Sequence, residues 1–225
     1  MRRMEMRAKH PLAIRWCHWV NFPLLALMIW SGILIYWAND VYRVGLGSFT
    51  VFSFFPEGFY HTFGVSHRLA QGMAWHFFFM WFFVINGIVY VTYTVLSGEW
   101  RCLVPTRESF REAVLVALHD LRLWKGTLPE RKFNGAQQIA YSGVILMGFG
   151  SMVTGLAIYK PTQLYWLTSL LGGYQAARFE HFLLALGYVT FFCVHIAQVV
   201  RAGWNNFRAM VCGYELVSKE ESANE

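Results

Sequence analysis

Four long stretches of this 225-residue chain contain no Asp, Glu, Lys or Arg. Each is close to the roughly 20 residues that an α-helix needs to cross a bilayer. The composition agrees, because 56% of the residues are hydrophobic and only 14% are charged, which is unusual for a soluble protein. The sequence therefore predicts an all-α fold: an antiparallel four-helix bundle in a membrane, forming one domain over residues 1–225. The predicted spans are 16–38, 73–96, 139–159 and 182–200.

The distribution of positive charge gives the orientation of these spans. Of the nineteen Lys and Arg residues, five precede the first span, seven lie in 97–138 and three follow the fourth span. The segments 39–72 and 160–181 carry only two each. Basic residues accumulate on the cytoplasmic side of membrane proteins, so both termini and the middle segment are expected to be cytoplasmic. Because the charges flank spans instead of forming one stripe, they do not indicate nucleic-acid binding.

The cytoplasmic segment 97–138 contains an amphipathic pattern that predicts a helix. Two interpretations stay open, a helix lying on the membrane surface and an ordinary solvated connection. Apolar Phe110, Val114, Leu118 and Leu121 share one face, and Arg107, Arg111 and Glu112 lie on the other.

The external segment 39–72 is rich in aromatic residues, with seven between Phe49 and Phe63. Such a segment is typical either of a docking surface for an external partner or of an aromatic belt at headgroup depth. Both interpretations stay open.

The four cysteines show no CxxC spacing, so neither a disulfide framework nor a zinc site is indicated. Cys17 is interpreted as a small apolar filler. The third span has no histidine but carries several glycines, which is typical of a scaffold helix that packs closely. No internal repeat is evident. The glycines are Gly143, Gly148, Gly150 and Gly155.

Histidines inside the spans are the strongest functional signal, because imidazoles in hydrocarbon need an explanation. His181 and His195 are fourteen residues apart in the fourth span. On an α-helix they lie within about 40° of one face and roughly 21 Å apart along the axis. One helix therefore offers a ligand near each membrane surface.

Matching depth supplies partners for these two histidines. His18, near the cytoplasmic end of the first span, can face His195. The partner of His181 should lie near the start of the second span, where His76 and His67 compete. These two are nine residues apart and would point to opposite faces of one helix. His76 is favoured because it lies inside the uncharged run, and His67 stays an alternative.

Pairs of neutral imidazoles are strong axial ligands for haem iron and give low-spin centres suited to electron transfer. The pattern predicts two non-covalent b-type haems, since no CxxCH motif occurs. Arginines at the span ends are either partners of the haem propionates or simple topology anchors. They are Arg15 and Arg201 inside, and Arg68 and Arg178 outside.

Three segments resemble one family: HPLAIRWCHWVN, WHFFFMWFFVINGIVY, and HFLLALGYVTFFCVH followed by RAGWNNFRAMVCGYE. The family is the four-helix di-haem cytochrome b subunits of bacterial hydrogenases, formate dehydrogenases, thiosulfate reductases and related molybdopterin oxidoreductases. The likeness covers nearly the whole chain. It implies that His18 and His195 ligate the cytoplasmic-side haem, and that His76 and His181 ligate the external one. Some hydrogenase-type relatives place the second-helix histidine nearer the helix start, which keeps His67 as the alternative.

The resemblance implies a multi-pass protein of the bacterial inner membrane that carries electrons between an external catalytic partner and quinone. The chain would be an electron-transfer subunit with no catalytic residue of its own, and electrons could flow in either direction. A molybdopterin oxidoreductase is the favoured partner, with a hydrogenase or a multihaem cytochrome as alternatives. The quinone would bind near the inner haem, where Arg15, Cys17 and Asn21 supply polar groups.

Two other functions stay open. One is a self-sufficient membrane di-haem oxidoreductase that exchanges electrons between quinone and a small external oxidant or superoxide. The other is a haem-free transporter or anchor, in which the histidines relay protons or bridge helices.

Overall fold

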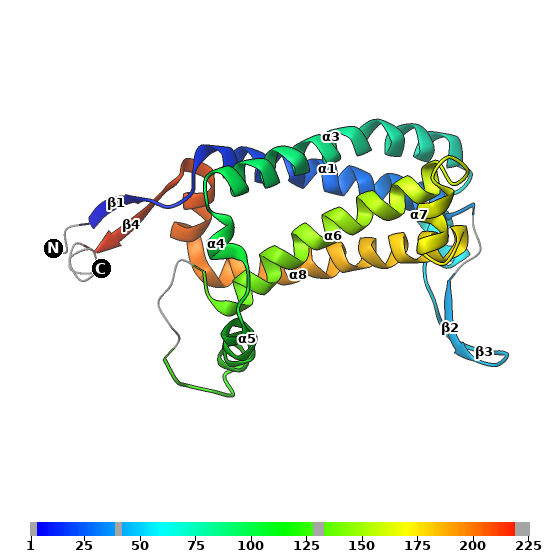
Figure 1. Cartoon of the computed structure of the whole chain (residues 1–225). Helices are drawn as coiled ribbons and strands as arrows, with labels where there is room; N and C mark the ends of the chain where they lie inside the picture. The colour runs from blue at the N-terminus through cyan, green and yellow to red at the C-terminus, as the bar shows by residue number, and fades with distance from the viewer. Residues whose placement is uncertain (1–3, 39–41, 128–132, 219–225) are drawn as a thin grey trace. The chain divides into compact units, whose positions relative to one another are not determined.

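The protein is described by a computed structural model over residues 4–38, 42–127 and 133–218. Four long helices dominate it (Figure 1). Each is long and apolar enough to cross a membrane, so the four predicted spans are confirmed. Several basic residues counted for the topology, Arg2, Arg3, Arg131, Lys132 and Lys219, lie outside the described residues. The helices are α1 (Leu12–Tyr36), α3 (Leu69–Leu96), α6 (Gly135–Tyr159) and α8 (Tyr174–Cys212).

The helix ends differ from the predicted spans because charge does not end a helix. Helix α1 ends at Tyr36, two residues earlier than predicted, and α3 begins at Leu69, four residues earlier than predicted. Helix α8 runs well beyond both predicted ends, and charged side chains occupy its first turns. Its regular conformation is interrupted at Gly203, which has a φ of 80° that glycine adopts without steric cost.

Shorter elements complete the described chain. The all-α prediction missed two antiparallel strand pairs, β1 with β4 and β2 with β3. Helices α4 and α5 fall in the cytoplasmic segment, and α2 and α7 in the external ones. The bounds are β1 (Met4–Ala8), β2 (Arg43–Leu46), β3 (Phe49–Ser53), α2 (Glu57–Thr62), α4 (Trp100–Leu103), α5 (Arg107–Asp120), α7 (Tyr165–Leu170) and β4 (Tyr214–Ser218).

The β1–β4 pair joins the two ends of the described chain (Figure 1). Glu215 accepts hydrogen bonds from Lys9 Nζ at 2.6 Å and from Arg7 Nη2 at 3.0 Å. Burial alone would raise the pKa of the Glu215 carboxyl, but these two cations outweigh it and hold the pKa below its usual value. The pairing places both ends together, as an even number of spans requires.

Residue contacts divide the chain into two compact units. The first is 13–89 and contains most of α1 and α3. The second combines 1–12 with 90–225 and contains α5, α6, α7 and α8.

In the first unit α1 and α3 approach closely at Gly72. A Cβ built there would lie 2.7 Å from Leu34 Cβ and 3.1 Å from the Ser31 carbonyl oxygen. Further along the pair, Asn86 Nδ2 donates to the Cys17 carbonyl at 3.1 Å and to Asn21 Oδ1 at 3.4 Å. Polar groups that the sequence suggested for quinone therefore link the two helices. Cys17 is buried, as expected for a filler.

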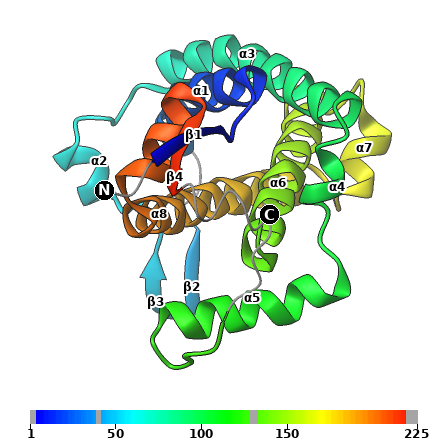
Figure 2. The same cartoon turned by 90° about the vertical axis from the view of Figure 1, so that its left-hand side faces the viewer.

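In the second unit α6 packs along α8 (Figure 2). Ala157 of α6 and Ala177 of α8 are fully buried in one cluster with Leu167 of α7. Small side chains therefore set this helix contact. At its other end α6 begins with a reciprocal cap between Asn134 and Gln137, with hydrogen bonds of 2.9 and 3.0 Å.

Helix α5 packs against the start of α6, where Ser109 Oγ donates to Gln138 Oε1 at 2.6 Å. Glu112 is buried beside Gly135, so the prediction that it lies on a solvated face is wrong. The reason is that its face of α5 packs on α6. The apolar face with Phe110 and Val114 is exposed, and its position on a membrane surface stays a prediction.

Candidate functional site

His76 lies near the external end of α3 and contacts α1. Its Nδ1 is 3.0 Å from Ser31 Oγ, and its Cε1 lies 3.8 Å from the position of a Cβ built at Gly32. The ring is half-buried. A serine and a glycine adjacent in sequence thus form the surface against which this imidazole packs.

His181 lies near the external end of α8 and contacts α6 in the same way. Its Nδ1 is 2.8 Å from Thr154 Oγ1, and its Cε1 lies 3.4 Å from a Cβ built at Gly155. This ring is also half-buried. Again a hydroxyl residue followed by glycine receives the imidazole.

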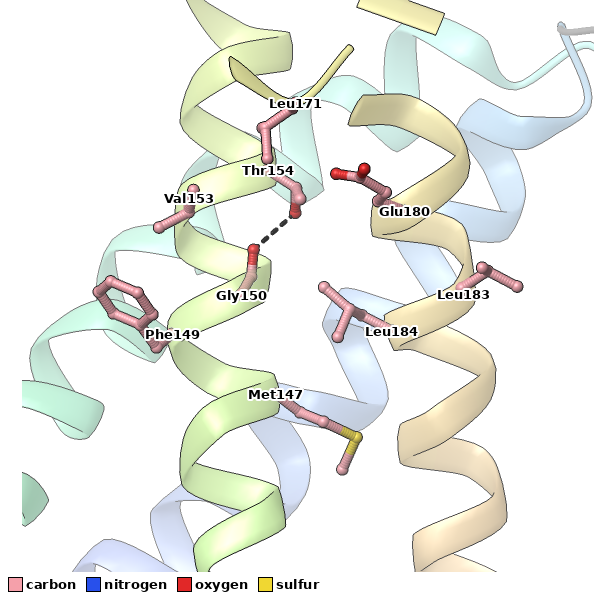
Figure 3. Close-up of a pocket in the computed structure, with 9 residues that line it drawn as sticks. All are labelled: Met147, Phe149, Gly150, Val153, Thr154, Leu171, Glu180, Leu183 and Leu184. Carbon is pink, nitrogen blue, oxygen red and sulfur yellow. Dashed lines mark hydrogen bonds between the residues drawn. The ribbon is translucent and has the colours of Figure 1, made fainter. Parts of the chain in front are cut away.

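The hydroxyl groups favour one position for the proton of each imidazole ring. Ser31 Oγ donates to the Met28 carbonyl at 3.0 Å. Thr154 Oγ1 donates to the Gly150 carbonyl at 2.7 Å, the bond drawn in Figure 3. A hydroxyl that donates to its carbonyl can only accept from the histidine, so the fully hydrogen-bonded arrangement has the proton on Nδ1. In that tautomer Nε2 carries the lone pair, the form of imidazole that ligates a metal.

The two histidines also occupy the same position within their own helices. His76 is the eighth residue of α3 and His181 is the eighth residue of α8. Both therefore lie about 10 Å along the axis from the first residue of their helices. Their pairing at one depth stays a prediction.

The hydroxyl residues belong to a repeated sequence motif. Helix α1 ends in Ser-Gly-Ile-Leu-Ile-Tyr over 31–36, and α6 ends in Thr-Gly-Leu-Ala-Ile-Tyr over 154–159. Each motif is followed, after an external connection, by a helix whose eighth residue is histidine. No internal repeat is evident from the sequence, because a six-residue motif stands out only once its contacts are known.

The third span is therefore not only a scaffold, because Thr154 of α6 contacts a predicted ligand. Of its predicted packing glycines, Gly148, Gly150 and Gly155 each face a side chain of α8. A Cβ at Gly143 would meet no atom of the described chain within 4 Å. The motif shared with α1 was the only sequence signal for this role.

His67 has a different setting from His76. It precedes α3, has a left-handed φ of 59° and is exposed. Its ring packs on Trp37 with centroids 4.3 Å apart. His67 and His76 were expected to lie on opposite faces of one continuous helix. The structure shows that they do not share a helix. The helix begins at Leu69, so only His76 lies within the span.

The cytoplasmic-side candidates are half-buried within their helices. His18, the seventh residue of α1, packs edge-on against Trp19 at 5.1 Å. His195 stacks on Phe191 with centroids 5.7 Å apart, eight residues before the Gly203 break. Each predicted pair takes one histidine from each compact unit, so the pairing itself stays a prediction.

The predicted arginines differ in their contacts. Arg201 Nη2 forms an ion pair with Asp120 Oδ1 at 2.8 Å, which joins α8 to α5. Arg178 donates to Gln175 at 3.0 Å and packs over the Tyr174 ring. Arg15 is half-buried in α1, and Arg68 is exposed before α3. A structural anchoring role accounts for Arg201, while propionate binding stays a prediction for all four.

An apolar groove lies between α6 and α8 beside the Thr154 hydroxyl (Figure 3). Met147, Val153 and Leu184 line it, with Glu180 as its one ionisable side chain. Leu183 on its rim is 46% exposed. This face of the helix pair therefore presents hydrocarbon-compatible surface next to the candidate ligand.

The donor set fits haem. Among the described residues no group of three or more His, Cys, Asp and Glu side chains could hold a bare metal ion. Haem iron needs only one or two protein ligands, because the macrocycle supplies four. A histidine whose Nδ1–H is hydrogen-bonded and whose Nε2 carries the lone pair has the tautomer and support typical of a metal ligand.

Membrane-spanning helices that carry half-buried histidines are typical of haem-binding membrane cytochromes of b type. The chain belongs to the prokaryotic cytochrome b561 family, whose family model matches residues 9–213. It is also similar to the putative protein-methionine-sulfoxide reductase subunit YedZ1 of Azospira oryzae (strain ATCC BAA-33 / DSM 13638 / PS). The two are 30% identical over 196 residues, which cover 87% of this chain and 91% of the relative.

Family membership establishes the general function. The protein is a membrane electron-transfer protein of the cytochrome b561 type that uses haem b, as the sequence predicted. It is a multi-pass protein of the bacterial inner membrane.

Proposed function

We propose that this chain is a di-haem subunit that carries electrons between the quinone pool and an external catalytic partner. Two haems b would supply the one-electron redox couples that this transfer across the bilayer requires. The chain itself would hold and orient them and separate the two aqueous phases. The single observation that carries the proposal is the duplicated contact between a hydroxyl oxygen and the Nδ1 of His76 and His181, each the eighth residue of its helix.

His76 and His181 are proposed as the axial ligands of the external haem. With Nδ1–H donated to the neighbouring hydroxyl, both would carry the lone pair on Nε2. Both also lie near the N-terminal ends of their helices, which are proposed to be external. His67 fits this role less well, because it precedes α3 in a left-handed conformation.

His18 and His195 are proposed as the ligands of the cytoplasmic-side haem. They lie within about three turns of the cytoplasmic ends of their spans, at α1 Leu12 and at the α8 break at Gly203. Quinone exchange is proposed on this side of the membrane.

The relative indicates what kind of partner to expect. It is named as a subunit of a putative protein-methionine-sulfoxide reductase. A reductase consumes electrons, so we propose outward flow, from quinol through this chain to an external reductase. A molybdopterin enzyme stays the favoured partner on the family resemblance described above.

Haem content of histidine variants tests the assignment. The purified chain should contain two haems by pyridine haemochromogen analysis and show low-spin b-type spectra. His76→Ala, His181→Ala, His18→Ala and His195→Ala should each lose about half of the haem, because an axial ligand is removed. His67→Ala is the matched control and should retain both haems.

Two outcomes would overturn the proposal. One is a wild-type content of one haem, which leaves the second pair without a role. The other is full haem retention in both His76→Ala and His181→Ala. Loss of haem in His67→Ala with retention in His76→Ala would instead assign the ligand role to His67 and not to His76.

A further inference from the structure

We propose that Ser31 and Thr154 are positioning residues that fix the tautomer and ring orientation of the two external haem ligands. The inference rests on the proposed role of His76 and His181. It goes further by assigning a function to two hydroxyl groups, one of them on a helix without histidine. It also predicts that the external haem is held by two copies of one structural device.

The directions of the hydrogen bonds at Ser31 and Thr154 support this role. Both hydroxyl groups have already donated their hydrogen to their own helix, Ser31 to Met28 and Thr154 to Gly150. While it donates to its carbonyl, each hydroxyl can only accept from an imidazole Nδ1–H. The opposite tautomer would require the hydroxyl to turn its hydrogen from the carbonyl to Nδ1, so that one of the two hydrogen bonds is lost.

The packing of each imidazole ring also supports this role. The residue after each hydroxyl is glycine, and the imidazole Cε1 occupies the space that a larger side chain would need. The hydroxyl and the glycine together restrict both the position and the rotation of the ring. A buried threonine in a helix can satisfy its hydroxyl with carbonyls alone and without a histidine neighbour, as Thr168 of α7 does with the Leu164 carbonyl and the Ala157 carbonyl of α6.

The expected chemical effect follows from the ligand. An Nδ1–H that donates to an acceptor makes Nε2 more basic, and this stabilises the oxidised iron more than the reduced iron. Removing the acceptor should raise the midpoint potential of the external haem. Each tenfold loss in the preference of the histidine for oxidised over reduced iron corresponds to a rise in midpoint potential of about 59 mV for one electron.

The test compares variants that remove the hydroxyl with a variant that keeps it. Thr154→Val and Ser31→Ala should weaken haem retention at the external site by about 10- to 100-fold. They should also raise its midpoint potential and alter its ferric low-spin EPR signal, which depends on ligand orientation. Thr154→Ser keeps a hydroxyl without adding volume and should keep wild-type values. The cytoplasmic-side haem should keep its potential in all three variants.

Thr168→Val is the matched control, because it removes a buried hydroxyl of the same unit that contacts no histidine. The external haem should keep its potential and EPR signal in this variant. If Thr154→Val loses the haem entirely, the outcome depends on Thr154→Ser. Retention in the serine variant supports the inference, and loss in both overturns it.

Failure of the inference can be separated from failure of the proposed function. Unchanged potential and EPR signal in Thr154→Val and Ser31→Ala would overturn the positioning role alone, provided that His76→Ala and His181→Ala still lose one haem. If the histidine variants retain both haems, the ligand assignment itself has failed.

Discussion

The helix pair α1–α3 and the helix pair α6–α8 orient a histidine in the same way but pack differently. At the fourth residue of the second helix, α3 has Gly72 in backbone contact with α1, whereas α8 has Ala177 in a cluster of small side chains. The hydroxyl-to-imidazole distances are nevertheless 3.0 and 2.8 Å. The contact to the histidine is thus retained while the helix packing around it varies.

The two pairs also differ in their external connections. Helix α6 is joined to α8 by fourteen residues that include α7, while α1 is joined to α3 by a segment with the β2–β3 pair and α2. Phe49 in β3 is 70% exposed and Phe63 after α2 is 66% exposed. The shorter connection also presents apolar side chains, since Trp166 and Leu170 of α7 are 65% and 76% exposed. The two connections therefore differ in their secondary structure and not in carrying exposed apolar side chains.

The strongest test of this comparison is Gly72→Ala. The new methyl would lie 2.7 Å from Leu34 Cβ and 3.1 Å from backbone atoms of α1, so the helices must separate. Such overpacking costs about 1–3 kcal/mol. Separation should also lengthen the Ser31–His76 bond, so we expect lower thermal stability and partial loss of the external haem.

Gly87→Ala is the control on the same helix, because its methyl would meet no atom of the described chain within 4 Å. Alanine favours helix over glycine by about 1 kcal/mol, so this variant should be as stable as the wild type or more so. Equal behaviour of the two variants would show that α1 and α3 do not touch at Gly72.

A smaller effect should distinguish the two glycines beside the rings. A methyl at Gly155 would lie 3.4 Å from His181 Cε1, and one at Gly32 would lie 3.8 Å from His76 Cε1. Gly155→Ala should therefore shift the absorption band and potential of the external haem, while Gly32→Ala should leave both near wild type. Gly143→Ala on α6 serves as the control. A larger shift in Gly32→Ala than in Gly155→Ala would reverse this ranking of the two pairs.

The smallest effect concerns the inner end of α8, where β4 pairs with β1. The pKa of Glu215 in the folded state is held below its usual value. Its carboxylate therefore stabilises the strand pair fully at any pH above that usual pKa. This contribution, at most about 1 kcal/mol for a pair near the surface, is lost as the pH falls through the folded pKa.

Hydrogen-exchange protection of the β1 amides, corrected for intrinsic rates, should therefore decrease on acidification in the wild type. Glu215→Gln should show weaker protection at neutral pH and little further change with acid. The β2–β3 pair serves as the internal reference. An unchanged pH dependence in the variant would assign the effect to another group.

The spans and their number could be predicted from sequence, because a bilayer imposes a length and a composition on each helix. The ends of α3 and α8 could not, since helices continue through headgroup depth while charge only marks where hydrocarbon stops. The β1–β4 pair was also beyond prediction. Its strands are about two hundred residues apart, and their pairing depends on Glu215 meeting Lys9 and Arg7.

Among the site residues, histidines were predictable because an imidazole in hydrocarbon is costly without a role. Ser31 and Thr154 were not, since a hydroxyl in a span usually bonds to its own helix backbone and carries no signal. Both of them do make that bond. The second use of the oxygen, as an acceptor for a histidine on another helix, emerges only from the three-dimensional contact.

That double use has a consequence for how the site tolerates change. The backbone carbonyls of Met28 and Gly150 are present whatever side chains surround them, so each oxygen is aimed by the main chain of its own helix. At each half of the site the orientation of the imidazole then depends on one side chain, Ser31 or Thr154. Neither ring should rotate when lipid-facing residues are substituted or when the surrounding lipids differ.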